Sequence, residues 1–147
     1  MSVISRFNRK LKQLKDSINP TIQETINKHK PLIIDQQTEE QMFEGKDSEG
    51  LNFVPKYALS TKKIKQKKGQ PTNRVTLKDS GDLYKSITVD ALTNEMIIKA
   101  NVEYFKYLVV HYNRNKILGL NEEFLDKFTC KLIVPNIQTK WKSIIRK

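Results

Sequence analysis

The sequence RVTLKDSGDLYKSI, residues 74–87, decides the fold that we expect. It opens with β-branched and apolar residues, which favour a strand, and then reaches the turn residues Asp79, Ser80 and Gly81. Asp79 or Ser80 is placed to cap a short helix that follows, and a glycine at this turn indicates a backbone angle that a side chain would oppose. The helix residues that we expect to face inward are Leu83, Tyr84 and Ile87.

A β-hairpin is predicted directly after this helix, over residues 87–102. Apolar and polar side chains alternate on both sides of Thr93-Asn94, which supplies the turn. KLIV, residues 131–134, is a further strand candidate. We therefore expect a small antiparallel sheet, with a buried set of Val89, Ala91, Met96, Ile98 and Ala100.

The N-terminal third is predicted to be helical and amphipathic. Five apolar residues recur at spacings of four, four, three and four, with basic residues on the opposite face. They are Val3, Phe7, Leu11, Leu14 and Ile18. Asn19-Pro20 should break this helix, and Thr21 can then cap a second one. Pro31 fits the first turn of a third helix, which Gly45 closes.

The middle of the chain combines turn signals with a run of lysines. Residues 46–55 indicate a tight turn anchored by Phe53 and Val54, and a short helix can follow over 57–64. Five lysines then occupy seven positions, and Gly69 and Pro71 end the run. Because these charges repel one another, we expect a mobile lysine-rich loop at residues 62–71.

The last third is predicted to be mostly helical. Residues 102–112 are apolar enough for a buried helix or a strand, and we favour the helix. Asn121 is placed to cap a helix over residues 122–128. Pro135 can open a final basic helix that carries Trp141.

These elements predict the α+β class: N-terminal amphipathic helices, a small antiparallel β-sheet with a hairpin, and a basic C-terminal helix. The expected organisation is an N-terminal helical arm, residues 1–45, and an α+β core domain, residues 46–147.

Residues for catalysis or metal binding do not cluster in the sequence. The two histidines, His29 and His111, have no second ligand at metal spacing, and Cys130 is alone. No phosphate-binding glycine motif occurs. No apolar run approaches the roughly 20 residues that cross a bilayer, and the N-terminus lacks a secretory signal. We expect no catalytic residue, no metal, no cofactor and no membrane contact.

The charge is high and unevenly distributed. The 147 residues carry a net +11, and residues 31–60 hold six acidic against two basic side chains between two basic segments. Such alternation suits contacts between identical subunits, or steers a polyanion. The lysines expected to face nucleic acid are Lys62, Lys63, Lys65, Lys67 and Lys68. The side chains expected to contact a partner or another copy are Phe7, Leu11, Leu14, Ile18 and Trp141.

Residues 77–87, LKDSGDLYKSI, resemble the L-x-x-[ST]-G-x-L-x-x-S-I signature of the tail-completion and head–tail joining proteins of tailed phages. Residues 41–50, QMFEGKDSEG, resemble a turn that precedes the signature in related phage proteins. Pro55, Tyr57, Thr61 and Lys62 lie as in an accompanying element, so the resemblance covers roughly residues 37–112.

The resemblance implies a virion structural protein, assembled in the host cytoplasm, that forms a homo-oligomeric ring at the head–tail junction. Its implied partners are the portal or other head–tail proteins, with non-specific contact to genomic DNA. An alternative from the residues alone is a cytoplasmic module that binds the phosphate backbone of nucleic acid without sequence readout.

Overall fold

The computed structural model describes residues 2–147 and divides them into two compact units. The first, which we call the helical unit, contains the residues up to Lys30 together with Asp90–Ile97 and Leu125–Lys147. The second, the mixed unit, contains Pro31–Val89 and Ile98–Phe124. The first boundary falls at residue 30, because the N-terminal and C-terminal helices pack on each other.

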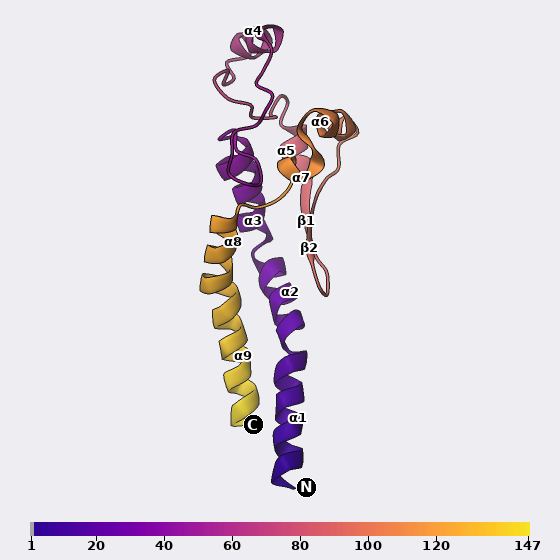
Figure 1. Ribbon diagram of the computed structural model, residues 1–147, viewed down its shortest axis with the longest axis vertical. Coiled ribbons are helices and arrows are strands. Elements are labelled where there is room, and N and C mark those ends of the chain that lie inside the picture. The colour runs from indigo at the N-terminus through magenta and orange to yellow at the C-terminus, as the bar shows by residue number, and fades with distance from the viewer. Residues whose placement is uncertain (1) are drawn as a thin grey trace. The chain divides into compact units, whose positions relative to one another are not determined.

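The helical unit is built from the two ends of the chain. Helices α1 (Val3–Asp16) and α2 (Ile18–Lys28) both contact α9 (Val134–Arg146), and the indigo and yellow helices lie side by side in Figure 1. The N-terminus of α1 is capped by Ser2, whose Oγ accepts a hydrogen bond from the Ser5 amide at 3.1 Å. The amphipathic N-terminal and C-terminal helices are thus confirmed.

The predicted helix break at Asn19-Pro20 is wrong. The chain bends at Ser17, and Pro20 lies in the first turn of α2, where a missing N–H leaves no intrahelical bond unmade. Thr21 is therefore not a cap. It lies inside α2, and its hydroxyl donates to the Ser17 carbonyl at 2.7 Å.

The predicted strand at residues 131–134 is also wrong. Helix α8 (Glu122–Phe128) continues through a π-helical segment η2 (Thr129–Ile133) directly into α9. A short apolar run does not distinguish a strand from a helix by its pattern. Pro135 cannot donate to the carbonyl one turn before it, and the wider π-helical turn precedes that position. The Asn121 cap is confirmed, because its Oδ1 accepts from the Phe124 amide at 2.9 Å.

The mixed unit begins with α3 (Lys30–Asp35) and the π-helical segment η1 (Gln36–Met42). Gly45 ends this stretch as expected, with a φ of 74° and its N–H donating to the Met42 carbonyl at 3.0 Å. Two buried glutamines then tie η1 to the far end of the unit. Gln37 bonds the Ile117 carbonyl and the Gly119 amide, each at 2.8 Å. Gln41 bonds the Gly119 carbonyl at 2.7 Å and the Asn121 amide at 2.9 Å, so every amide atom of both side chains is used.

The core of the mixed unit forms around residues 74–87. Helix α5 (Asp82–Ser86) leads into strand β1 (Ile87–Ala91), and Leu83, Tyr84 and Ile87 are buried as predicted. They pack with Met42, Phe53, Val75, Phe105 and Ile117. Each such side chain contributes about 1.5–3 kcal/mol when it leaves water. Phe53 anchors the preceding turn as expected, whereas Val54 is exposed.

The sheet is a single antiparallel hairpin of β1 and β2 (Met96–Ala100). Its turn is closed by a bond from the Leu92 amide to the Glu95 carbonyl at 2.8 Å, which confirms the predicted turn at Thr93-Asn94. Within the helical unit, Gln23 of α2 donates to the Ala91 carbonyl at 3.2 Å, which fastens the hairpin tip.

The segment before α5 joins no sheet, and Leu77 in it adopts a φ of 54°, so the strand predicted there is wrong. The hydroxyl of Tyr57 accepts the backbone N–H groups of Thr76 and Leu77 at 3.0 and 3.2 Å. A side chain thus occupies the donors that a strand neighbour would take. Helices α6 (Phe105–Tyr112) and α7 (Arg114–Ile117) complete the unit. The helix that we favoured for residues 102–112 is confirmed, but it is not buried as expected, because Phe105 alone of α6 is buried and Val110 is 81 % exposed. The fold is α+β, as predicted.

Candidate partner-binding surface

Helix α1 leaves its hydrophobic face uncovered. Val3, Ile4, Phe7 and Leu11 share this face and are 82, 71, 61 and 47 % exposed, and no residue of α1 is buried. We call these four residues the apolar stripe. Single exposed apolar residues are ordinary on protein surfaces, but a contiguous row of this size marks a surface that a partner covers.

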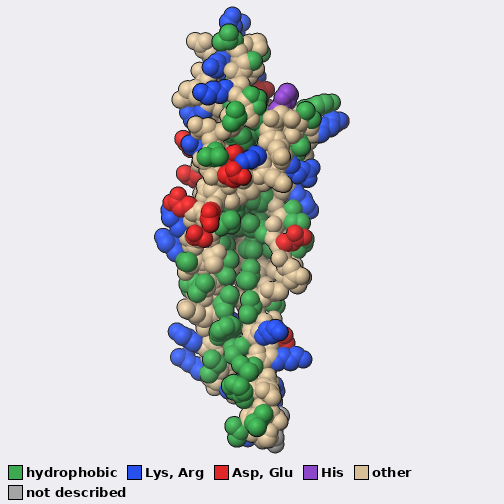
Figure 2. All heavy atoms as spheres, viewed as in Figure 1, with side chains coloured by type: hydrophobic (Ala, Val, Ile, Leu, Met, Phe, Trp, Pro, Cys, Tyr) green, Lys and Arg blue, Asp and Glu red, His purple; other side chains and the backbone are tan. Residues whose placement is uncertain are grey.

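Helix α9 borders the apolar stripe and extends its hydrophobic character. Lys10 of α1 donates to the Ile145 carbonyl in the last turn of α9 at 2.8 Å, which joins the two helices near the end of the chain. Ile145 itself is 55 % exposed. Figure 2 shows hydrophobic side chains gathered along α1 and α9, with Lys and Arg on both flanks of the band.

The structure brings the five predicted contact residues together in the helical unit. Phe7 and Leu11 are exposed, whereas Leu14, Ile18 and Trp141 are half-buried. Part of the N-terminal arm is covered by its own chain, because α1 and α2 pack beside α9. What remains free is the outer part of the hydrophobic face.

Trp141 is the only tryptophan of the sequence, and its indole N–H is unsatisfied. The Nε1 atom is buried and has no hydrogen-bond acceptor among the described residues. A buried donor without a partner costs about 1–3 kcal/mol, so tryptophans in finished interiors and interfaces usually find one.

The charges of the helical unit are strongly positive. It carries thirteen Lys and Arg against five Asp and Glu, a net of +8. The acidic segment 31–60 is the complementary region of the chain, but most of its carboxylates already have partners. Glu39 pairs with Lys78, Glu44 with Arg74, and both Asp47 and Glu49 with Lys116. In the part of the chain that is described, Asp35 and Glu40 of this segment remain without an ion pair.

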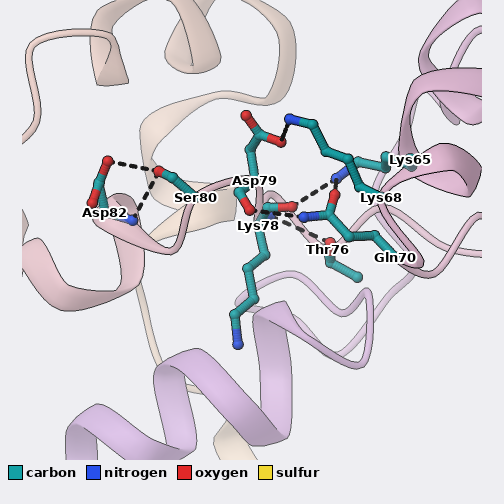
Figure 3. Close-up of polar contacts among 8 residues, drawn as sticks. All are labelled: Lys65, Lys68, Gln70, Thr76, Lys78, Asp79, Ser80 and Asp82. Atoms are coloured by element: carbon teal, nitrogen blue, oxygen red, sulfur yellow. Dashed lines mark hydrogen bonds and ion pairs between the residues drawn. The ribbon is translucent and has the colours of Figure 1, made fainter.

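The lysine-rich stretch is not the mobile loop that we predicted. Residues 59–67 form helix α4 (Leu59–Lys67), and hydrogen bonds to the 78–79 segment fix the end of this helix. Lys65 is buried, and its ammonium donates to the Lys78 carbonyl at 2.6 Å and to Gln70 Oε1 at 3.2 Å (Figure 3). Lys65 consequently does not face nucleic acid.

Lys68 and Gln70 hold the same turn from the end of α4. Lys68 Nζ lies 2.5 Å from Asp79 Oδ1, and the Gln70 amide donates to the Asp79 carbonyl at 2.7 Å, as Figure 3 shows. The hydrogen bond from Lys68 lowers the pKa of the Asp79 carboxyl, although both side chains are largely exposed. Of the five predicted lysines, Lys62, Lys63 and Lys67 alone remain without a partner within residues 2–147.

The predicted turn motif is present, with its roles divided differently. Gly81 adopts a φ of 91°, which favours glycine and agrees with the predicted turn. Ser80 Oγ accepts from the Asp82 amide at 3.3 Å and donates to the Asp82 carboxylate at 2.6 Å, so Ser80 supports the start of α5. Asp79 is engaged by Lys68 and does not cap the helix.

No group of three or more His, Cys, Asp or Glu side chains in residues 2–147 could hold a metal ion. Cys130 is exposed in the π-helical segment η2. None of the described helices is both long and apolar enough to cross a bilayer.

No protein-family model matches the chain, and neither the curated proteins nor the solved structures contain a match to it.

Proposed function

We propose that this chain is a structural subunit of a phage virion, which assembles into a ring at the head–tail junction and joins the capsid portal to the tail around the DNA channel. The observation that carries the proposal is the uncovered apolar stripe of α1. Identical copies that each cover this stripe by a different surface of the next copy make a heterologous contact, and such contacts generate rings when they close.

The hydrophobic character of the stripe supports a lasting contact between copies. Phe7 and Leu11 would each contribute about 1.5–3 kcal/mol if fully removed from water. The N–H of Trp141 also lacks an acceptor among the described residues, and a neighbouring copy can supply one.

Exposed hydrophobic groups on the mixed unit offer a matching surface. Leu32, Leu51 and Val54 are 45, 59 and 76 % exposed and lie in the acidic segment 31–60. Asp35 and Glu40, which have no ion pair in the described residues, lie in the same segment. We infer that this segment of one copy covers the apolar stripe of the next copy, which basic residues flank. Burial of hydrophobic side chains would contribute most to this contact, and attraction between opposite charges would contribute less.

The residues of the phage-like signature support the proposal from the core of the mixed unit. Leu83 and Ile87 are buried, Gly81 makes the turn, and Ser86 Oγ accepts from the Asn101 amide at 3.1 Å. The side chains at the signature positions thus have structural roles in this chain.

Electron microscopy of purified tailed particles that incorporate a tagged copy of this chain tests the proposal. We expect the tag to be located at the head–tail junction with rotational symmetry about the tail axis. A tag distributed over the capsid surface, or absent from the particles, would contradict the proposal.

A further inference from the structure

We propose that a small hollow in the mixed unit binds a phosphate group. The hollow has a volume of about 120 Å³, several times the roughly 10–15 Å³ that one water molecule needs. Three cationic side chains line it from three separate segments: Lys56, Lys62 of α4 and Arg74. Thr72 and Asn73 add a hydroxyl and an amide to the same wall.

Two of these cations have no partner within residues 2–147. The ammonium groups of Lys56 and Lys62 make no hydrogen bond, ion pair or ring contact with any described residue. Lys62 is half-buried, and Lys56 is exposed. Lys63 and Lys67 of the same lysine run also lack a partner among the described residues, but of these three lysines Lys62 alone lines the hollow.

Arg74 is held in place before any ligand arrives. Its Nε donates to the Phe43 carbonyl at 2.7 Å, and its Nη1 donates to Asn73 Oδ1 at 3.2 Å. The guanidinium also lies over the ring of Phe43, 5.0 Å from the centroid. A positioned guanidinium loses little side-chain entropy when it binds an oxyanion, which raises affinity.

Gly45 makes room for this arrangement. It lines the hollow with a φ of 74°, and a Cβ built on it would lie 2.9 Å from the Cβ of Arg74. Any larger residue would therefore displace Arg74 from the wall.

The floor and the surrounding charges favour a multiply charged anion. Phe53 and Val75 are buried beneath the hollow, and a low-dielectric floor strengthens the attraction between charges above it. Glu44 Oε1 lies 4.0 Å from Arg74 Nη2 and compensates that cation only weakly, and Lys46 adds a further cation bonded to Asn52. Three cations around one small space suit a phosphate better than a singly charged carboxylate.

The phosphate group can belong to a free phosphate ion or to the backbone of DNA, and titration of the full-length chain distinguishes the two. Inorganic phosphate and a 20-base-pair duplex are the probes, and the amide NMR signals of Asn73 and Val75 report occupancy of the hollow. Lys56→Gln with Lys62→Gln is the test variant. Lys63→Gln with Lys67→Gln is the matched control, because these lysines lie on α4 without lining the hollow.

We expect phosphate to shift both amide signals. The test variant should bind phosphate about tenfold or more weakly, since the loss of one hydrogen bond to a charged group lowers affinity by about this factor. The control variant should bind phosphate as the wild type does. If the test variant also binds the duplex more weakly than the control variant does, the ligand is a backbone phosphate. If only its affinity for inorganic phosphate is lower, the ligand is a free phosphate ion.

The proposed site would be contradicted if both variants lost phosphate affinity equally. It would also be contradicted if phosphate shifted the amide signals of all the lysines but not those of Asn73 and Val75. Circular dichroism of both variants establishes that the fold is retained. The mass of the assembled protein is a separate readout, so failure of the phosphate site leaves the assembly proposal standing.

Discussion

The buried ammonium of Lys65 lies 2.6 Å from the carbonyl oxygen of Lys78 and donates a hydrogen bond to it (Figure 3). This bond joins α4 to the segment that leads into α5. The Lys65 ammonium also lies over the ring of Tyr57, 4.9 Å from the ring centroid. A lysine that appears from the sequence to be one of five surface charges is thus a structural residue.

Replacement of Lys65 should destabilise the fold. Lys65→Met keeps the apolar stem but leaves the Lys78 carbonyl and Gln70 Oε1 without their donor, at an expected cost of about 1–3 kcal/mol. Lys63→Met is the control, since exposed substitutions usually change stability by less than about 0.5 kcal/mol. Urea unfolding of both variants gives the two free energies, and equal values would show that Lys65 has no structural role.

Two glycines should differ in how they tolerate alanine. Gly45 and Gly81 both have positive φ, so Gly81→Ala should cost about 1–2 kcal/mol through backbone strain alone. A Cβ at Gly81 meets nothing within 4 Å, whereas one at Gly45 lies 2.9 Å from the Cβ of Arg74. Gly45→Ala should therefore lower the melting temperature further than Gly81→Ala. The reverse order would contradict the close approach of Arg74.

Tyr84 should make stability depend on alkaline pH. Burial raises the pKa of its hydroxyl well above the ordinary value, and that hydroxyl donates to the Thr76 carbonyl at 2.6 Å. Because the unfolded phenol ionises near pH 10 and the folded one does not, the contribution of Tyr84 is complete below about pH 10 and declines above it.

Tyr84→Phe tests this dependence. At pH 7 the variant should lose about 1–3 kcal/mol, because the buried carbonyl loses its donor. Its unfolding free energy should then fall less steeply than that of the wild type between pH 9 and about 11. Burial also raises the pKa values of Tyr104 and Tyr112, so some alkaline dependence remains. Parallel pH profiles would show that Tyr84 is not the source.

Local patterns predicted the parts of the fold in which the chain acts on its nearest neighbours. The hairpin, the Asn121 cap, the Gly45 helix end and the inward side of α5 are examples, since turn chemistry and helical spacing decide them. The sequence did not predict the structure where a side chain distant in the sequence forms hydrogen bonds with backbone groups. Nothing in the local pattern shows that Tyr57 occupies the donors of Thr76 and Leu77.

For the candidate surfaces too, local patterns predicted some features, whereas contacts between residues distant in the sequence decided the others. The spacing of Phe7 and Leu11 predicted one helix face, and that face is uncovered. Charge alone did not separate the buried Lys65 from the unpaired Lys62, because burial depends on which face of α4 meets the 74–79 segment. The side-chain amides of Gln37 and Gln41 bond to the backbone of Ile117 and Gly119. The sequence did not predict these bonds, because both residues appear in it only as polar residues in a helical pattern.

Trp141 should report whether the helical face is covered. As the only tryptophan, it is a specific fluorescent probe, and it lies half-buried on α9. When copies assemble, its emission should move to shorter wavelength and acrylamide should quench it less, since water is excluded from the indole. Unchanged emission and quenching across the assembly transition would place the contact elsewhere.

Sedimentation velocity of the full-length chain measures most directly whether the apolar stripe drives assembly. We expect the wild type to form a closed species whose mass is a multiple of the 17.2 kDa chain. Phe7→Asp with Leu11→Asp places charge on the stripe and should sediment as a single chain, because burying unpaired carboxylates is strongly unfavourable. Asn8→Asp, a neighbouring exposed position on α1, should assemble as the wild type does. A wild type that remains a single chain at every concentration, or a stripe variant that assembles normally, would contradict the account.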